Sequence, residues 1–302
     1  MDVALLTVSY RGDLELARDL CASVDAHVDP AIEHVLLVPE RDASLFANLA
    51  TGRRRLVAIE SILPSGFSRL PTPYRIELKP FFSKRIREIW ATPKGLVRGW
   101  IIQQIVKLSA HRATNAPAIV FADSDIVFVR AFNRDTVVRG DLVRLYHRPG
   151  ETSASAPHRR WHREAAELLG LPATDYFGAD YIGNLLSWRR DTLEKLQARL
   201  EEIGGAPWQN VLAGAPALSE YILYGAFAEH VLGDASGHYL STEDLAHPSW
   251  HYDIARAESR EAFLRDFSDN HLAVLIQSTE GLGLDARRAL IAAMTEKRQR
   301  VA

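Results

Sequence analysis

The sequence predicts an α/β fold in which a mostly parallel central sheet is flanked by helices, and two observations lead to this prediction. Apolar runs of strand length alternate with longer stretches of helical periodicity in the first part of the chain, the pattern typical of a doubly wound parallel sheet. The run 118–121 is apolar without alternation, and a second apolar run, 126–129, follows it after a short acidic insert. Strands covered by helices on both faces have this composition.

The first apolar runs, taken in chain order, justify three strands. Residues 3–10 are expected to form the first strand, and a helix with Asp13 as its N-cap follows, because apolar side chains recur there at helical spacing. Further strands are expected over 34–38 and 56–59, each stopped by proline or glycine. Residues 67–99, with four prolines, are expected to be irregular and to form a flap over the site or an acceptor-facing insertion.

The second part of the chain alternates in the same way. A helix over 99–110 is apolar around most of its circumference, so we expect it to be buried against the sheet just before the 118–121 strand. The remaining elements are expected in this order: strands over 141–147 and 180–188, helices over 190–203 and 219–230, a final strand over 272–276 and a closing helix.

The composition limits the class of protein. A chain of 302 residues with 47% hydrophobic and 25% charged residues is an ordinary globular protein, and we expect a single domain spanning 1–302. A formal net charge of −2 provides no global basic field, which argues against nucleic acid as a partner. The single cysteine, Cys21, excludes an internal disulfide and fits a reducing compartment.

No apolar run approaches the roughly 20 residues that a bilayer-spanning helix needs, and no basic leader precedes the first strand. We therefore expect no transmembrane segment, and a cytoplasmic protein that is at most peripheral at the inner membrane.

Asp123 and Asp125 are the anomaly between the two apolar runs. Two apart in an extended chain, they project to the same side, at the sheet edge where open α/β sheets bind ligands. Neighbouring carboxylates repel unless a cation lies between them, and a divalent cation carrying a substrate diphosphate meets that need. The pair is therefore a candidate metal–diphosphate site; the alternative is a polar strand end in which one aspartate caps the next element.

Other polar residues are expected near this edge. Tyr10, Arg11 and Asp13 lie at the tip of the first strand, where a nucleotide base is usually received, although a surface turn with a helix cap explains the same residues. Gln104 and Lys107 share one face of the buried helix and need partners. A diphosphate or ribose in the crevice would provide them, and a structural amide–ammonium pair is the alternative.

Two further candidates lie in the second half. Glu220, at a helix start, is either a first-turn acid favoured by the helix dipole or a carboxylate that projects into the crevice. Among the histidines of the last third, His271 is preferred as a third metal ligand because it adjoins a predicted strand, while a hydrogen-bonded structural imidazole is the alternative.

These segments resemble nucleotide-sugar glycosyltransferases of the GT-A fold. The sequence looks closest to a bacterial family catalogued as DUF6492. The matching segments, spread through most of the chain in the expected order, are Trp100 to Leu108, Phe121 to Val129 with its Asp-Ser-Asp, Ile182 to Trp188, and Ser219 to Gly225.

The resemblance implies a donor-binding half, residues 1–130, that takes a UDP- or GDP-sugar. Mn²⁺ or Mg²⁺ would be held by Asp125, with Asp123 serving the metal or the ribose and His271 as the third ligand. The donor-binding set implied by the matched segments and by the first strand's tip is Tyr10, Arg11, Asp13, Gln104, Lys107, Asp123, Ser124 and Asn184.

The resemblance also implies an acceptor-binding half, residues 131–302, that takes a glycan or a small molecule. Glu220 or Asp180 would act as base toward the acceptor hydroxyl if the enzyme inverts configuration. If it retains configuration, the same residue would stabilise the oxocarbenium-like state or bind the acceptor. By family analogy, the context is a bacterial cell-surface polysaccharide or a glycosylated natural product.

Two other functions fit the same acid pair. An apolar strand that ends in Asp-x-Asp also presents the nucleophile of haloacid-dehalogenase-type phosphotransferases, in which Asp123 would form an aspartyl-phosphate. Three predicted strands precede the pair, however, whereas that motif normally lies near the N-terminus. The other alternative is a non-catalytic module that binds sugar nucleotides, against which the intact acid pair argues.

Overall fold

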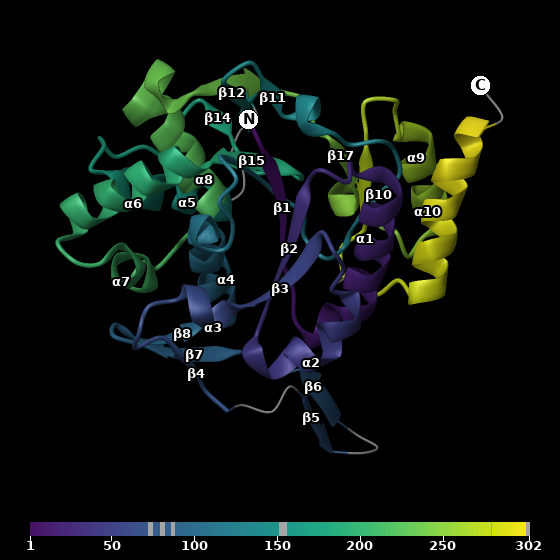
Figure 1. Ribbon diagram of the computed structural model, residues 1–302, viewed down its shortest axis with the longest axis horizontal. Helices are drawn as coiled ribbons and strands as arrows, with labels where there is room; N and C mark the ends of the chain where they lie inside the picture. Colours follow the sequence, from purple (N-terminus) through teal and green to yellow (C-terminus); the bar gives the residue numbers. More distant parts are fainter. Residues whose placement is uncertain (72–74, 79–81, 86–87, 151–155, 279, 300–302) are drawn as a thin grey trace.

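A five-stranded sheet lies at the centre of the computed structural model, which describes residues 1–71, 75–78, 82–85, 88–150, 156–278 and 280–299. Its strand order is β15-β9-β1-β2-β3 (Figure 1). The strands β1 (Val3–Val8), β2 (Glu33–Val38), β3 (Arg54–Ala58) and β9 (Ala118–Phe121) are parallel, and β15 (Leu186–Arg189) runs antiparallel to β9. The predicted α/β fold with a mostly parallel sheet is confirmed.

Helices cover both faces of this sheet (Figure 1). Alternate residues of β1 and β9 point to opposite faces. On one face they pack with α1 (Leu14–His27). On the other they pack with α4 (Gly99–Leu108), α6 (Arg190–Gly204) and α8 (Glu220–Ala226). The 118–121 strand is therefore apolar throughout because both of its faces are buried.

A second, three-stranded sheet begins directly after the acid pair. It has the order β10-β18-β17, and β10 (Ile126–Phe128) runs antiparallel to β18 (Ala273–Leu275). The third strand is β17 (Ala246–Pro248), and apolar residues of α9 (Ala257–Asp266) and α10 (Leu284–Gln299) cover the sheet. The last part of the chain, from β17 to α10, is thus packed against β10, the strand that follows the acids.

The segment 67–99 contains strands, contrary to the expected irregular structure. Trp90 is buried and anchors one of these strands to the core, but polar and turn residues between the strands hide their periodicity. The strands β4 (Ser68–Arg69), β7 (Ile89–Thr92) and β8 (Gly95–Arg98) form another three-stranded sheet in this segment. A separate hairpin consists of β5 (Arg75–Leu78) and β6 (Phe82–Arg85).

Two predicted elements are divided in the structure. The strand predicted over 180–188 consists of β14 (Ala179–Asp180) and β15, separated by an irregular segment in which Leu185 has a φ of 51°. The helix predicted over 219–230 changes after α8 into a π-helical segment, Phe227–Leu232. The remaining elements are α2 (Ala43–Phe46), α3 (Ile59–Ile62), β11 (Val138–Arg139), β12 (Leu142–Tyr146), β13 (Arg148–Pro149), α5 (Ala156–Leu169), α7 (Trp208–Ala213) and β16 (His238–Ser241).

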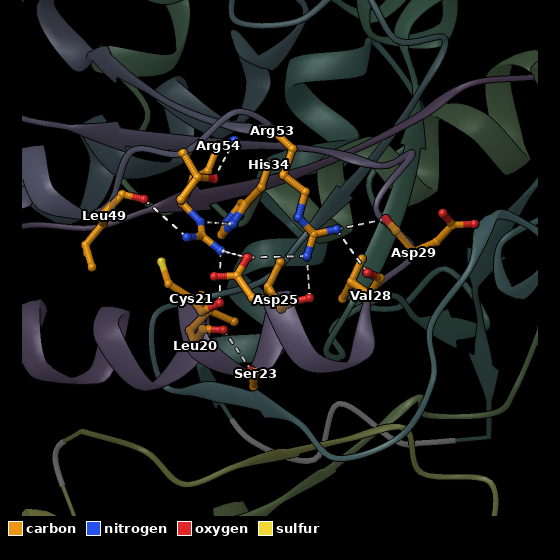
Figure 2. A network of polar contacts seen from close by, with 12 residues as sticks. Leu20, Cys21, Ser23, Asp25, Val28, Asp29, His34, Leu49, Arg53 and Arg54 are labelled. Carbon is orange, nitrogen blue, oxygen red and sulfur yellow. Dashed lines mark hydrogen bonds and ion pairs between the residues drawn. The ribbon is translucent and has the colours of Figure 1, made fainter.

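A buried polar network joins α1 to the amino ends of β2 and β3 (Figure 2). Arg54 is 2% exposed; its guanidinium contacts Asp25 at 2.6 Å and donates through Nε to Nδ1 of His34 at 2.9 Å. The other donors of Arg54 reach the carbonyls of Leu49 and Cys21. Burial and the nearby guanidinium groups lower the pKa of His34 to about 3. Each buried cation here has its acceptors, so the network is a structural one.

Candidate functional site

A cavity of about 730 Å³ opens at the carboxyl ends of β1 and β9. Tyr10 and Asp13 line it just after β1, and residues 123–125 line it just after β9. Trp100 and Gln103 of α4 contribute to the rest of its wall. Ligands of open α/β sheets bind at this edge, and the volume is typical of a small-molecule site. This cavity is therefore the candidate site.

Residues 123–125, called the acid turn below, are held in place by short hydrogen bonds. The N–H of Ile126 donates to the carbonyl of Asp123 over 3.0 Å, which closes the turn. Ser124 is buried, and its hydroxyl donates to Oγ of Ser9 over 2.9 Å. The predicted donor-binding residue Ser124 thus ties the acid turn to the end of β1, between two aspartates that line the cavity.

Lys107 lies beneath the acid turn and is 4% exposed. Its Nζ is 3.0 Å from Oδ1 of Asp123 and 3.3 Å from Oε1 of Glu220, and it donates to the hydroxyl of Tyr221. An ammonium group has three donors, so these acceptors account for all of them. The structure therefore connects Lys107 to Asp123 itself, as an internal counter-ion.

The buried charges around Lys107 stabilise its protonated form. Burial alone would lower the pKa of Lys107, but Asp123, Tyr221 and Glu220 together raise it well above the ordinary value. Burial raises the pKa of Glu220, and the attraction of Lys107 opposes that rise. Because Glu220 is buried and does not line the cavity, it faces Lys107 rather than a bound ligand.

Gln104 belongs to the same buried cluster. Its Oε1 accepts a hydrogen bond from the N–H of Glu220 over 3.0 Å, and only 2% of the residue is exposed. Neither Gln104 nor Lys107 lines the cavity, whereas Gln103, about 100° further round the helix, does. Gln104 and Lys107 are thus linked through Glu220, whose N–H binds Gln104 and whose carboxylate lies 3.3 Å from Lys107.

The surroundings of Asp125 and Asp13 disfavour the ionised form of both carboxyl groups. Burial and the charge of Asp123 raise the pKa of Asp125 to about 7, and the same two causes raise the pKa of Asp13 to about 6. Neither carboxylate has a cation within ion-pair distance in the part of the chain that the structure describes. A cation at the acid turn would relieve the repulsion that Asp123 exerts on both carboxylates.

The donor atoms at this edge fit a hard divalent cation as part of a larger ligand set. Carboxylate oxygens are the ligands that Mg²⁺ and Mn²⁺ favour. Among the described residues, no group of three His, Cys, Asp or Glu side chains is arranged to hold a metal ion. The carboxylates of the acid turn would therefore share such an ion with ligand oxygens or water.

The structure does not bring His271 to the acid turn. Because β18 runs antiparallel to β10, the residues after β18, not those before it, meet Asp125. The N–H of Ser278 donates to Oδ2 of Asp125 over 3.2 Å. His271 precedes β18; its Nδ1 accepts from the N–H of Ser268, and its ring stacks on Phe267. His271 thus makes local contacts at the end of β18 away from Asp125.

Two other predicted residues are engaged away from the cavity. Arg11 forms an ion pair at 2.6 Å with Asp42, which is fully buried, so its guanidinium holds the loop after β1 in place. Asp180 is buried as well; it contacts Nδ1 of His158 at 2.8 Å and accepts from the N–H of Ile182. The cavity lining includes neither Arg11 nor Asp180.

Asn184 lies at the same end of the sheet as the acid turn. It is buried, and β15 begins two residues later with Leu186 opposite Phe121 of β9. The residue between, Leu185, has positive φ, a conformation that costs energy for a branched side chain. This left-handed backbone conformation occurs just before β15, at the end of the sheet where the acid turn lies.

Sequence reasoning missed several residues at the site. Trp90 and Arg98 line the cavity from the segment 67–99, and Ser278 lines it from the end of the chain. Arg287 of α10 donates to the carbonyl of Asp125 over 2.8 Å. The position of Trp90 and Arg98 just before the 99–110 helix was a usable signal for both residues, because that helix was expected beside the acids. Nothing local marked Ser278 or Arg287.

Comparisons with known proteins identify one family. The family model described as a family of unknown function, DUF6492, matches residues 3–298. No curated protein matches the sequence. Among solved structures, the chain is similar to the apo crystal structure of mouse xyloside xylosyltransferase 1, with 9% identity, a TM-score of 0.48, and coverage of 94% of this chain and 100% of that chain. Within the described ranges, no helix has the length and apolar character needed to cross a membrane.

Proposed function

The chain belongs to the DUF6492 family, and we propose that it is a metal-dependent glycosyltransferase of GT-A-like fold. It would move a sugar from a nucleoside-diphosphate sugar to an acceptor hydroxyl. The observation that carries the proposal is the group of three carboxyl side chains, Asp13, Asp123 and Asp125, on the wall of a cavity at the carboxyl edge of the sheet. A divalent cation supplies the missing positive charge, and a diphosphate provides further oxygen ligands to it.

The proposed roles follow from which side chains reach the cavity. Asp125 would be the main metal ligand, because Asp123 is already partly neutralised by Lys107. Tyr10 and Asp13, on the β1 side of the cavity, would receive the base and ribose of a UDP- or GDP-sugar. When bound, Mn²⁺ or Mg²⁺ stabilises the negative charge of the departing nucleoside diphosphate.

Glu220, Gln104 and Lys107 enter the proposal as positioning residues. Gln104 fixes the start of α8, Glu220 holds Lys107, and Lys107 fixes the carboxylate of Asp123. Such support restricts a catalytic group to one orientation before the ligand arrives. Asp180, which does not line the cavity, is proposed to orient His158. Both residues belong to the second half of the chain, which would bind a glycan or small-molecule acceptor.

A donor-hydrolysis screen tests this function without knowledge of the acceptor. The protein is incubated with UDP- and GDP-sugars and Mn²⁺, and release of the nucleoside diphosphate is followed. We expect release from at least one donor, lost on chelation and in Asp125→Asn. Asp269→Asn, which alters an aspartate whose side chain is 87% exposed, is the control and should retain activity.

The phosphotransferase alternative makes the opposite prediction. If the protein hydrolyses simple phosphate esters in a reaction that requires Asp123, and releases no nucleoside diphosphate from any donor, the glycosyltransferase proposal is wrong.

A further inference from the structure

The last helix of the chain contacts the acid turn directly. Arg287 of α10 is 3% exposed, and its Nη2 donates to the main-chain carbonyl of Asp125 over 2.8 Å. Its Nη1 is 3.4 Å from Oδ2 of Asp19 on α1. One guanidinium group therefore joins three elements that are far apart in sequence, namely α1, α10 and the acid turn.

The backbone just before α10 holds the same aspartate from another side. The N–H of Ser278 donates to Oδ2 of Asp125 over 3.2 Å, and the N–H of Ile276 lies 3.4 Å from its carbonyl oxygen. Ser278 also lines the cavity. Asp125 is thus held through its side chain and its main chain by residues more than 150 positions later in the chain.

The planar fork of arginine suits this role. Two of its nitrogens reach acceptors on different elements at the same time, which the single ammonium of lysine does not reproduce. Fixing the carbonyl of Asp125 restricts the rotation of the acid turn, so less conformational entropy is lost when its carboxylate binds a ligand.

We propose that Arg287 is a positioning residue for the acid turn, which fixes the orientation of Asp125 toward the cavity from outside the cavity. This inference rests on the proposed function for its consequence, metal–diphosphate binding, and on the described contacts alone for its structural part. It assigns a role in the site to the C-terminal helix, which none of the sequence motifs indicated.

Arg288 offers a matched control. It is the next residue on α10 and binds the same Asp19, with Nη2 2.8 Å from Oδ1, but it has no contact with Asp125. Arg287→Gln and Arg288→Gln therefore remove the same charge and an interaction with the same acid. They differ in the bond to the acid turn and in burial, since the side chain of Arg287 is 3% exposed and that of Arg288 is 45% exposed.

The first readout is Mn²⁺ affinity, measured by titration with and without UDP or GDP on the full chain. Loss of a group that orients a metal ligand typically weakens affinity by about 10–100-fold. We expect at least about a tenfold weaker Kd in Arg287→Gln, an intermediate loss in Arg287→Lys, and an unchanged Kd in Arg288→Gln. Equal effects of the two glutamine variants, or no effect of either, would overturn the proposal.

The second readout does not depend on the proposed function. Hydrogen exchange of the amides of residues 122–127, followed by mass spectrometry, should be faster in Arg287→Gln than in Arg288→Gln, while exchange in β1 stays the same in both. Equal exchange at 122–127 would contradict the positioning role. If Arg287→Gln does not fold, Arg287→Lys decides by the same comparison. A wild type that binds neither nucleotide with Mn²⁺ counts against the proposed function, and the exchange result still decides the role of Arg287.

Discussion

Two charged clusters, each built around a buried cation, lie at opposite edges of the central sheet, and they balance their charge differently. At the amino edge, Arg54 meets Asp25, His34 and two carbonyls, and its donors are matched by acceptors. At the carboxyl edge, Lys107 is matched in the same way, but the carboxylates of Asp125 and Asp13 have no cation within ion-pair distance among the described residues, and their pKa values are raised. A complete network is what stability requires; an incomplete one indicates a place where a ligand supplies the missing charge.

The largest effect is expected from the complete network. Arg54→Met leaves three acceptors, Nδ1 of His34 and the carbonyls of Leu49 and Cys21, without their donor. A buried acceptor left unsatisfied costs about 1–3 kcal/mol, so we expect a loss of about 3–5 kcal/mol in the free energy of unfolding. Urea denaturation at pH 7 measures it. Arg55→Met is the control, because Arg55 is exposed, its partner Glu33 is half-buried, and a pair so accessible to water contributes at most about 1 kcal/mol. Similar losses in the two variants would show that the Arg54 network is not a structural centre.

Lys107 is expected to have a somewhat smaller effect. Lys107→Met leaves Glu220 buried without its cation, and the cost should be about 3 kcal/mol. Glu220 can take up a proton in response, because burial already raises its pKa. The double variant Lys107→Met, Glu220→Gln should therefore be more stable than Lys107→Met alone by more than about 1 kcal/mol, a coupling measured by a double-mutant cycle. Additive effects would mean that the two side chains do not form one network.

The acid turn should respond with the opposite sign. Asp125→Asn removes a charge that burial and Asp123 both disfavour, so we expect stability at pH 7.5 to rise by about 1–2 kcal/mol in the absence of metal. The matched change at the other edge, Asp25→Asn, should lower stability because it takes an ion-pair partner from Arg54. Thermal and urea unfolding of both variants tests the pair of signs. Destabilisation by Asp125→Asn would remove the evidence for uncompensated charge.

The stability of the two clusters should also depend on pH with opposite sign. The pKa of Asp125 is raised from 3.8 to about 7, so the folded state binds more protons and this residue's contribution to stability falls as pH rises from about 4 to 7. The pKa of His34 is lowered from 6.5 to about 3, so its contribution falls as pH drops below 6.5. Relative to wild type, Asp125→Asn should gain stability as pH rises through this window, by less than about 1.4 kcal/mol per pH unit. A constant difference between the two proteins from pH 5 to 8 would contradict the assignment.

The sequence was sufficient for the parallel sheet and for the place of the acids in it. The apolar run 118–121, followed by two aspartates, placed the site at the carboxyl edge of the sheet, because strand type and edge follow from local pattern and connection rules. The identity of the buried partners was less accessible. Whether Gln103 or Gln104 faces the cavity depends on a rotation of about 100° around one helix, and both positions are polar in the sequence.

Long-range contacts were beyond local reasoning. His271 was assigned to the site because a strand follows it, but the antiparallel pairing of β18 with β10 puts the opposite end of that strand at Asp125. Strand direction in a second sheet is set by tertiary packing, which no pattern within residues 272–276 encodes. The contact between Arg287 and the acid turn has the same origin, because it depends on how α10 packs against α1 and β10.

The most direct measurement is calorimetric titration of UDP and GDP, with and without Mn²⁺, into the wild type and Asp125→Asn. If the excess carboxylate charge at the acid turn marks a metal–diphosphate site, one nucleotide binds the wild type only when Mn²⁺ is present, and Asp125→Asn abolishes that binding. Nucleotide binding that is independent of Mn²⁺ and unchanged in Asp125→Asn, or no binding of either nucleotide, would contradict the account.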